Sequence, residues 1–315
     1  MTTETPSLPR TRPPDTSPSR AEAPTAVERE RPAWLFLAPF SIMYLLFLVG
    51  PTIYMIVASL YNTSLVKEGL GTFAGLSNYV EVLGRADFRS AMGHTVLFTL
   101  LTTPPLVILA FVFAVLANRI RRGQWFFRLA FFLPFILPSA SIALIWVFIF
   151  MPDTGLLNLV QGWIGMTPSA VLADPNWAMW GIAAATVWWT IGINFVLYLA
   201  GLQDVPREVY EAAAIDGASP WQQIRYLTIP LLGRTTTLVV LLQIIASLKI
   251  FDQVFLMTSG GPGQATQVAL TFIAGVGFTD NRIGVASAAS VVLFIVIMII
   301  AAARQGLTRF QNARA

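Results

Sequence analysis

Residues 203–233 read QDVPREVYEAAAIDGASPWQQIRYLTIPLLG and carry the most specific pattern in the chain. Pro206 fits the first turn of a helix, where its missing N–H costs nothing, and Asp204 is a candidate cap for the same helix. Gly217 supplies the left-handed residue that ends this helix. The stretch therefore predicts a first short helix followed by a tight turn.

A second short helix is predicted directly after the turn. Ser219 is followed by Pro220 and by Gln222, which is the pattern of a capping box with proline at the first helical position. This helix is expected to stop before Pro230, because proline restricts the residue that precedes it. Residues 203–233 are thus predicted to form a helix–turn–helix.

Long apolar segments surround this hairpin. The chain is 56% hydrophobic and 11% charged, whereas soluble domains are about 25% charged. Crossing a bilayer takes about 20 helical residues, and six segments are long enough. They are 33–61, 90–117, 125–150, 178–202, 235–257 and 283–303. The sequence predicts an all-α polytopic membrane protein with six transmembrane helices and a helix–turn–helix between the fourth and fifth. Kinks are expected at the prolines inside these segments. These are Pro39, Pro51, Pro104, Pro105, Pro134 and Pro138.

The predicted domains are a disordered N-terminal tail at 1–32, a membrane domain at 33–304 and a short C-terminal tail at 305–315. The first tail is rich in proline and lacks an apolar run, so it cannot bury enough surface to fold. Of the 20 Lys and Arg residues, fifteen fall on the side of this tail, four fall on the other side, and Lys249 lies inside a span. This asymmetry places both termini in the cytoplasm.

The composition also excludes several chemistries. There is no cysteine and His94 is the single histidine, which excludes thiolate sites and histidine-rich metal clusters. An intramembrane enzyme would need a convergent catalytic set, whereas this sequence offers scattered Ser, Asp and Glu. No catalytic residue, metal ligand or cofactor site is therefore expected.

The predicted hairpin resembles the EAA loop of binding-protein-dependent ABC importer permeases. The family pattern is Glu-Ala-Ala, three residues, Gly, nine residues, Ile, any residue, Leu-Pro. Here it reads Glu211-Ala212-Ala213, then Gly217, then Leu227-Thr228-Ile229-Pro230, with the two aliphatic residues exchanged. Asp216 beside Gly217 resembles the carbohydrate-uptake branch, as in permeases for maltose or glycerol phosphate.

Two further stretches resemble the sugar permeases. Residues 73–79 read FAGLSNY and resemble their Gly-Leu-x-Asn-Tyr segment. Residues 251–266 begin with Phe-Asp and contain Gly-Gly-Pro at 260–262, like a second segment of that branch. His94-Thr95 departs from the Asn-Thr that is commoner there. The resemblance covers about residues 34–310.

The resemblance implies a transport subunit and a set of partners. It implies that the hairpin is a coupling helix that docks on a cytoplasmic ATPase subunit. The implied coupling residues are Glu211, Ala212, Ala213, Asp216, Gly217 and Pro230. The implied partners are a second, similar permease, two ATPase subunits and an extracytoplasmic binding protein. The chain has no Walker A loop, so ATP and Mg²⁺ would be bound by the ATPase partner.

Polar residues inside two spans are candidates for a substrate path, because intramembrane polar groups usually face a bundle interior or a wet cavity. Thr186, Thr190 and Asn194 share one helical face, and Gln243 and Ser247 share another. One reading is helix–helix hydrogen bonding. The other is a wet path that binds substrate hydroxyls, with Trp188 or Trp189 stacking on a sugar ring. The selected path residues are Thr186, Trp189, Thr190, Asn194, Gln243 and Ser247.

Lys249 and Asp252 form a candidate intramembrane charge pair near the outer end of the fifth span. Mutual pairing is the structural interpretation, and contact with substrate or gating is the functional one. For the whole chain, the alternatives to an importer permease are an ATP-independent secondary transporter, a membrane enzyme and a membrane scaffold. A secondary transporter would give no reason for the hairpin and often has two related halves.

Overall fold

The computed structural model of the protein describes residues 30–66, 68–120, 123–167 and 169–312. Within these ranges the regular structure is helical, apart from an isolated bridge between Tyr61 and Phe73. The helices are α1 (Glu30–Tyr44), η1 (Leu45–Val49), α2 (Gly50–Ala58), α3 (Ser77–Gly84), α4 (Ala86–Arg119), α5 (Gln124–Ile136), α6 (Ser139–Ile149), α7 (Leu156–Trp163), η2 (Val171–Ala173), α8 (Ala178–Gln203), α9 (Arg207–Ile215), α10 (Pro220–Gln223), η3 (Ile224–Thr228), α11 (Ile229–Leu231), α12 (Gly233–Leu248), α13 (Asp252–Thr258), α14 (Ala269–Ala274), η4 (Gly275–Thr279) and α15 (Ile283–Asn312). The all-α prediction is confirmed.

Among the described residues, four helices are long and apolar enough to cross a membrane, and there are up to six if each of two bent helix pairs counts as one span. Most of the predicted tail, residues 1–29, lies outside the described residues, and α1 begins at Glu30. At the other end, α15 continues through the predicted C-terminal tail to Asn312.

The chain divides into two compact units, Met1–Thr52 and Ile53–Ala315. In the first unit, α1 runs into the π-helical turn η1. The N–H of Gly50 donates to the carbonyl of Leu45, five residues back. Pro51 follows and has no N–H to donate, so the wider π turn lets the helix pass this proline without a break. Large apolar side chains along this segment, such as Phe36 and Phe47, are exposed.

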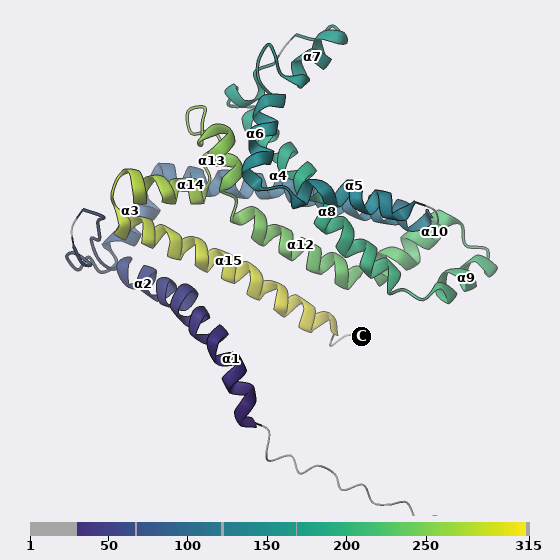
Figure 1. Cartoon of the computed structure of the whole chain (residues 1–315), viewed down its shortest axis with the longest axis horizontal. Coiled ribbons are helices and arrows are strands. Elements are labelled where there is room, and N and C mark those ends of the chain that lie inside the picture. Colours follow the sequence, from purple (N-terminus) through teal and green to yellow (C-terminus); the bar gives the residue numbers. More distant parts are fainter. Residues whose placement is uncertain (1–29, 67, 121–122, 168, 313–315) are drawn as a thin grey trace, which may run out of the picture. The chain divides into compact units, whose positions relative to one another are not determined.

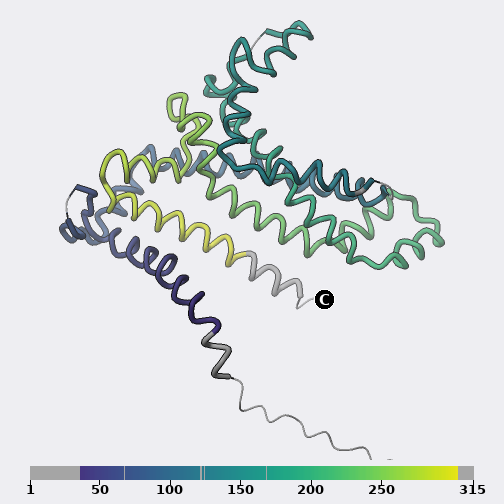
Figure 2. The backbone as a smooth tube through the Cα atoms, viewed as in Figure 1, coloured from purple at the N-terminus to yellow at the C-terminus, as the bar shows by residue number. Residues whose placement is uncertain are grey.

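The third predicted span, 125–150, is a pair of helices rather than one kinked helix. In the second unit, α5 ends at Ile136, α6 begins at Ser139, and their axes differ by 96°. The trace turns sharply at this point (Figure 2). Pro138 explains the break, because its missing N–H and the restriction on Leu137 end a helix more completely than an isolated interior proline does.

The prediction of a single helix over 235–257, the fifth span, is also wrong. α12 ends at Leu248, and Lys249 leaves the helical conformation with φ −102° and ψ 16°. A new helix, α13, begins at Asp252. The break takes both charged side chains out of a helix interior and leaves them exposed.

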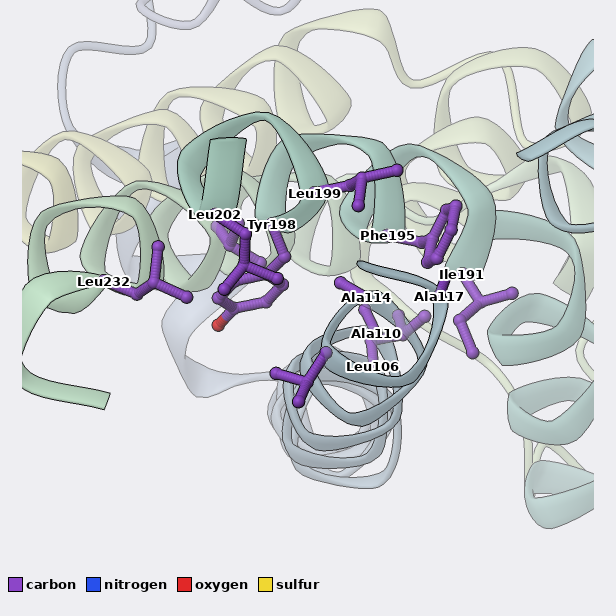
Figure 3. Close-up of a cluster of buried hydrophobic side chains, with 12 residues drawn as sticks. Leu106, Ala110, Ala114, Ala117, Ile191, Phe195, Tyr198, Leu199, Leu202 and Leu232 are labelled. Atoms are coloured by element: carbon purple, nitrogen blue, oxygen red, sulfur yellow. The ribbon is translucent and has the colours of Figure 1, made fainter. Parts of the chain in front are cut away.

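Helix α8 packs along α4 and α5 in the second unit (Figure 1). Small side chains on α4, including Ala110 and Ala114, are fully buried and let the helices approach closely. Phe195 and Tyr198 of α8 fill the space that these alanines leave (Figure 3). The backbones of α8 and α5 approach each other closely at Gly192 of α8. A Cβ there would lie 2.9 Å from the carbonyl carbon of Phe131 in α5. This contact fixes the position of α5.

The stretches that resemble sugar permeases outside the hairpin join distant parts of the second unit. The side-chain amide of Asn78 donates to the carbonyls of Ser59 and Tyr61 at 2.9 and 3.0 Å. Farther along the chain, Thr258 and Thr266 join their hydroxyls at 2.7 Å. These residues hold loops in place.

His94 belongs to the same framework. Its Nδ1 lies 3.1 Å from the carbonyl oxygen of Gln267 and donates to it. The neighbouring Thr95 accepts from the N–H of Ala269 at 2.9 Å. The two residues thus anchor the start of α14 on α4. Within the described ranges, no group of three or more His, Cys, Asp or Glu residues could hold a metal ion.

Candidate functional site

A cavity of about 340 Å³ lies between α8, α12, the end of α5 and the segment where α12 gives way to α13. Its wall includes residues from α4, α5, α8, α12 and the segment that joins α12 to α13. All six residues selected for a substrate path, and both members of the candidate charge pair, line it. The volume is within the range of small-molecule sites, about 300–1,000 Å³.

Polar side chains of α8 and α12 form hydrogen bonds with one another in the wall of this cavity. The amide nitrogen of Asn194 donates to the Gln243 side-chain oxygen at 3.2 Å. The Gln243 amide in turn lies 3.4 Å from the hydroxyl of Ser247, which is 3.1 Å from the hydroxyl of Thr102 in α4. The helix–helix hydrogen bonds considered from the sequence are therefore present. They also hold a row of polar groups at the cavity wall, so the two readings of these residues are compatible.

The two threonines of the α8 face are satisfied locally. Thr186 and Thr190 donate to the carbonyls four residues earlier, at 2.9 and 2.8 Å. Each hydroxyl oxygen keeps lone pairs with which it can accept another hydrogen bond. These side chains are thus acceptors at the cavity wall rather than free donors.

Trp189 and Trp188 lie in different surroundings. Trp189 lines the cavity, and its indole N–H donates to the carbonyl of Leu137 at 3.3 Å. This carbonyl lies at the break between α5 and α6. The ring of Trp189 also lies 6.2 Å from that of Phe135, centre to centre. Trp188 instead lies edge-on to Trp146, outside the cavity wall. Of the two candidates for stacking, Trp189 is the one at the cavity.

The charged end of the cavity is arranged differently from the predicted pair. Asp252 accepts a hydrogen bond from the Ser139 hydroxyl at 2.7 Å. Among the ion pairs of the described residues, none joins Asp252 to Lys249. The turn after α12 separates the two groups, and both side chains are exposed. The hydrogen bond joins the first residue of α6, which follows the break after α5, to the first residue of α13, which follows the break after α12.

Several wall residues were not among the sequence candidates. Gln253 is 2% exposed and lines the cavity, and its side-chain nitrogen has no hydrogen-bond partner. In the sequence, its position directly after Asp252 was the one indication that Gln253 belongs to the cavity wall. Phe98 and Phe135 also line the cavity, but nothing distinguishes them from other aromatic residues of their segments. Ser139 and Thr102 do not line the cavity themselves, and they became recognisable only through their hydrogen bonds to the wall residues Asp252 and Ser247.

The predicted hairpin is formed by α9 and α10 with a tight turn between them. The N–H of Ala218 donates to Ala213 at 2.9 Å and the N–H of Gly217 donates to Ala214 at 3.1 Å. This is the Schellman arrangement, and it places Gly217 at φ 81°, where a side chain would be strained. The prediction that Gly217 ends the first helix is confirmed.

The second helix begins as predicted and ends later than predicted. Ser219 and Gln222 form a reciprocal capping box, with bonds of 2.7 and 3.4 Å. The helix does not stop before Pro230, however. A π turn, in which Ile229 donates to the carbonyl of Ile224, carries it to Leu231 before a bend of 65°. The prediction that Asp204 caps the first helix is wrong, because Pro206 occupies the N-cap position of α9.

The hairpin presents an exposed surface in which carboxylates and small side chains alternate. Glu211, Ala212 and Asp216 are exposed, and Ala213 is half-buried. Apolar groups lie beside them, with Ile215 86% and Trp221 66% exposed. Pro230 is also exposed. The hydroxyls of Tyr210 and Thr228 meet at 3.1 Å and join α9 to the second helix. Hydrogen bonds thus hold the hairpin surface in place, and the surface exposes apolar area that a partner could cover.

Sequence and fold comparisons agree with one another. A family model described as binding-protein-dependent transport system inner membrane component matches residues 107–309. The chain is 34% identical to the probable ABC transporter permease protein YurN of Bacillus subtilis, over 84% of this chain and 91% of that protein. It is 33% identical to the sulfoquinovosyl glycerol transport system permease protein SmoG of Agrobacterium fabrum, over 86% and 88% respectively.

A solved structure has the same fold. It is a chain from the crystal structure of a bacterial alginate ABC transporter in complex with an alginate pentasaccharide-bound periplasmic protein. The TM-score is 0.79 at 23% sequence identity, and the match covers 90% of this chain and 96% of that one. The likeness extends well beyond the hairpin and the cavity.

Proposed function

The chain belongs to the family of binding-protein-dependent transport system inner membrane components, and we propose that it forms half of the translocation path of an ATP-driven importer for a sugar or related polyol. The observation that carries the proposal is the cavity beside α8, which lies at the break between α5 and α6 and at the break between α12 and α13. Transporters often build their substrate sites from discontinuous helices, because the broken ends expose backbone and side-chain polar groups at membrane depth.

The cavity wall favours a ligand with many hydroxyl groups. Between α8 and α12 its polar groups are hydroxyls and amides, such as those of Thr190, Asn194 and Gln243. Trp189 adds an aromatic ring on which the apolar face of a sugar can stack. The name of SmoG refers to sulfoquinovosyl glycerol, and the solved structure is that of an alginate transporter. Both compounds are carbohydrates or carbohydrate derivatives, which supports the same substrate class here.

The hairpin is the proposed contact with a separate ATPase subunit. Ala212 and Ala213 allow a close approach to a groove on that subunit, and Glu211 and Asp216 offer carboxylates to basic groups there. The capping box and the Schellman turn keep the hairpin rigid. A rigid hairpin converts closure of the ATPase subunits into movement of α8 and α12, the helices that it connects and that line the cavity.

The remaining partners follow from this role. A second, similar permease completes the path, an extracytoplasmic binding protein delivers the substrate, and two ATPase subunits bind ATP and Mg²⁺. In this proposal the protein spans the bacterial cell membrane several times and has both termini in the cytoplasm. Its own contribution is transport and not catalysis.

The experiment is uptake by proteoliposomes that contain the complex purified from its native host. Radiolabelled neutral and acidic sugars and polyols are offered with and without ATP inside and binding protein outside. The proposal expects uptake that requires both. Uptake by this chain alone, without ATP, would instead establish a secondary transporter.

A further inference from the structure

The outer end of the cavity holds polar groups of three kinds. Lys249 contributes an exposed ammonium group, Asp252 an exposed carboxylate, and Gln253 a buried side-chain amide with no partner for its nitrogen. All three line the cavity within a stretch of five residues. We propose that this end is a subsite for an uncharged polyol, in which ligand hydroxyls bridge the Lys249 ammonium, the Asp252 carboxylate and the Gln253 amide. The proposal rests on the proposed function, since it names the substrate class of the same cavity.

The charges determine which ligand fits. Lys249 and Asp252 carry opposite unit charges, so together they leave this end of the cavity without net charge. A phosphate, sulfonate or carboxylate at Lys249 would also lie near the Asp252 carboxylate, and the repulsion would offset much of the attraction. A hydroxyl group avoids this conflict because it can accept from the ammonium and donate to the carboxylate.

The hydrogen bond from Ser139 positions the carboxylate for this role. It occupies one oxygen of Asp252 from the α6 side at 2.7 Å. An ionised carboxylate can accept several hydrogen bonds, so the group retains acceptor capacity toward a ligand hydroxyl. Because Ser139 and Asp252 stand at the two helix breaks, a ligand on Asp252 would also contact the junction between α6 and α13.

Gln253 supplies the most specific signal. A buried polar atom without a hydrogen-bond partner is destabilising, and each such group in a folded protein requires an explanation. Thr103 of α4 has an equally orphaned hydroxyl and is 7% exposed, but it does not line the cavity. Comparing substitutions of Gln253 and Thr103 therefore distinguishes the effect of a buried unpaired atom on stability from an effect on ligand binding.

The first test compares Gln253→Leu with Thr103→Val in the native complex. Both changes remove a buried orphan, so neither is expected to lower thermal stability. Gln253→Leu should reduce uptake of a transported neutral sugar at least tenfold, and Thr103→Val should leave it within twofold. Loss of stability in Gln253→Leu, or equal uptake by both variants, would overturn the role of Gln253.

The second test measures the charge of the cavity without knowledge of the ligand. The chain has no cysteine, so Ala246→Cys places a single thiol at an exposed position of the cavity wall. Its reaction rates with cationic and anionic methanethiosulfonates are measured in the full complex, and their ratio is compared with the ratio for free cysteine.

The proposal expects the two ratios to agree within about threefold. Adding Lys249→Met should then shift the ratio about tenfold toward the cationic reagent, and adding Asp252→Asn should shift it as far toward the anionic one. A tenfold preference for the anionic reagent before either change, or uptake of acidic solutes alone, would overturn the neutral subsite. The rate ratio remains measurable if ATP-driven uptake is absent, so failure of the proposed function is distinguishable from failure of the subsite.

Discussion

Replacing Gly192 by alanine is expected to push α5 away from α8. The added Cβ would lie 2.9 Å from the carbonyl carbon of Phe131 and from the Cα of Phe132. Both atoms belong to the backbone, so no side chain can rotate to make room. Moving these two carbons to ordinary van der Waals contact at 3.4 Å requires a shift of about 0.5 Å, and the carbonyl oxygen of Phe131, which lies closer still to the added Cβ, requires more.

The energetic cost follows from overpacking. Inserting a methyl group into a packed interior costs about 1–3 kcal/mol, and alanine recovers about 0.5–1 kcal/mol of helix propensity relative to glycine. The net loss therefore lies between about 0 and 2.5 kcal/mol, and contacts with backbone atoms, which cannot rotate away, favour the upper part of this range. Because Phe135 of α5 lines the cavity, the same shift should also lower uptake.

The matched control is Gly93→Ala in α4. Gly93 is exposed and helical, and nothing lies within 4 Å of an added Cβ. The assay is thermal unfolding of the purified complex, followed for both variants by loss of the monodisperse peak on size-exclusion chromatography. Gly192→Ala should unfold several degrees below the wild type, and Gly93→Ala should not. Equal unfolding temperatures would refute the packing between α5 and α8.

Three further predictions concern α3 and the hairpin. Asn78→Ala should destabilise the complex by about 1–3 kcal/mol in thermal unfolding, because it leaves the buried carbonyl of Ser59 and the part-buried carbonyl of Tyr61 without their donor; an unchanged melting temperature would contradict this. The hydrogen bonds from Arg282 hold the pKa of Glu81 below its ordinary 4.5, so their stabilisation should be complete above about pH 4.5 and disappear as the pH falls through the lower folded-state pKa. Glu81→Gln should remove this acid-dependent part of the melting curve, and an identical pH profile in the variant would refute the assignment. Ser219→Ala should cost the hairpin about 1 kcal/mol and increase its hydrogen–deuterium exchange, without a change at the cavity.

Local patterns in the sequence were sufficient to predict the hairpin turn. Gly217 and the capping box of Ser219 act through hydrogen bonds to residues three to five positions away, so their geometry is contained in the local sequence. The faces of α8 and α12 were also predictable, because residues four apart share a helical face. Which tryptophan accompanied them was not, since that depends on the rotation of α8 against α5.

The breaks in the helices were harder to predict than the helices themselves. Pro138 signalled a kink, but the 96° angle depends on the packing of α6 against α13. Nothing local ends α12 at Leu248, and the apolar pattern continues past Lys249. The late end of the second hairpin helix was equally hard to predict. A proline can end a helix, or the helix can pass it through a π turn, and the local sequence does not decide which of the two occurs at Pro230. Gln253 gained its significance only from the cavity that surrounds it.

The measurement that tests the coupling role most directly is ATP-driven uptake by the full complex with Glu211→Lys in the hairpin. Asp204→Lys is the matched control, because it makes the same charge change at an exposed residue outside the two hairpin helices. We expect Glu211→Lys to abolish both uptake and the ATP hydrolysis that binding protein stimulates, while the complex remains folded and Asp204→Lys transports normally. Normal coupled uptake by Glu211→Lys would contradict the assignment of the hairpin as the contact with the ATPase.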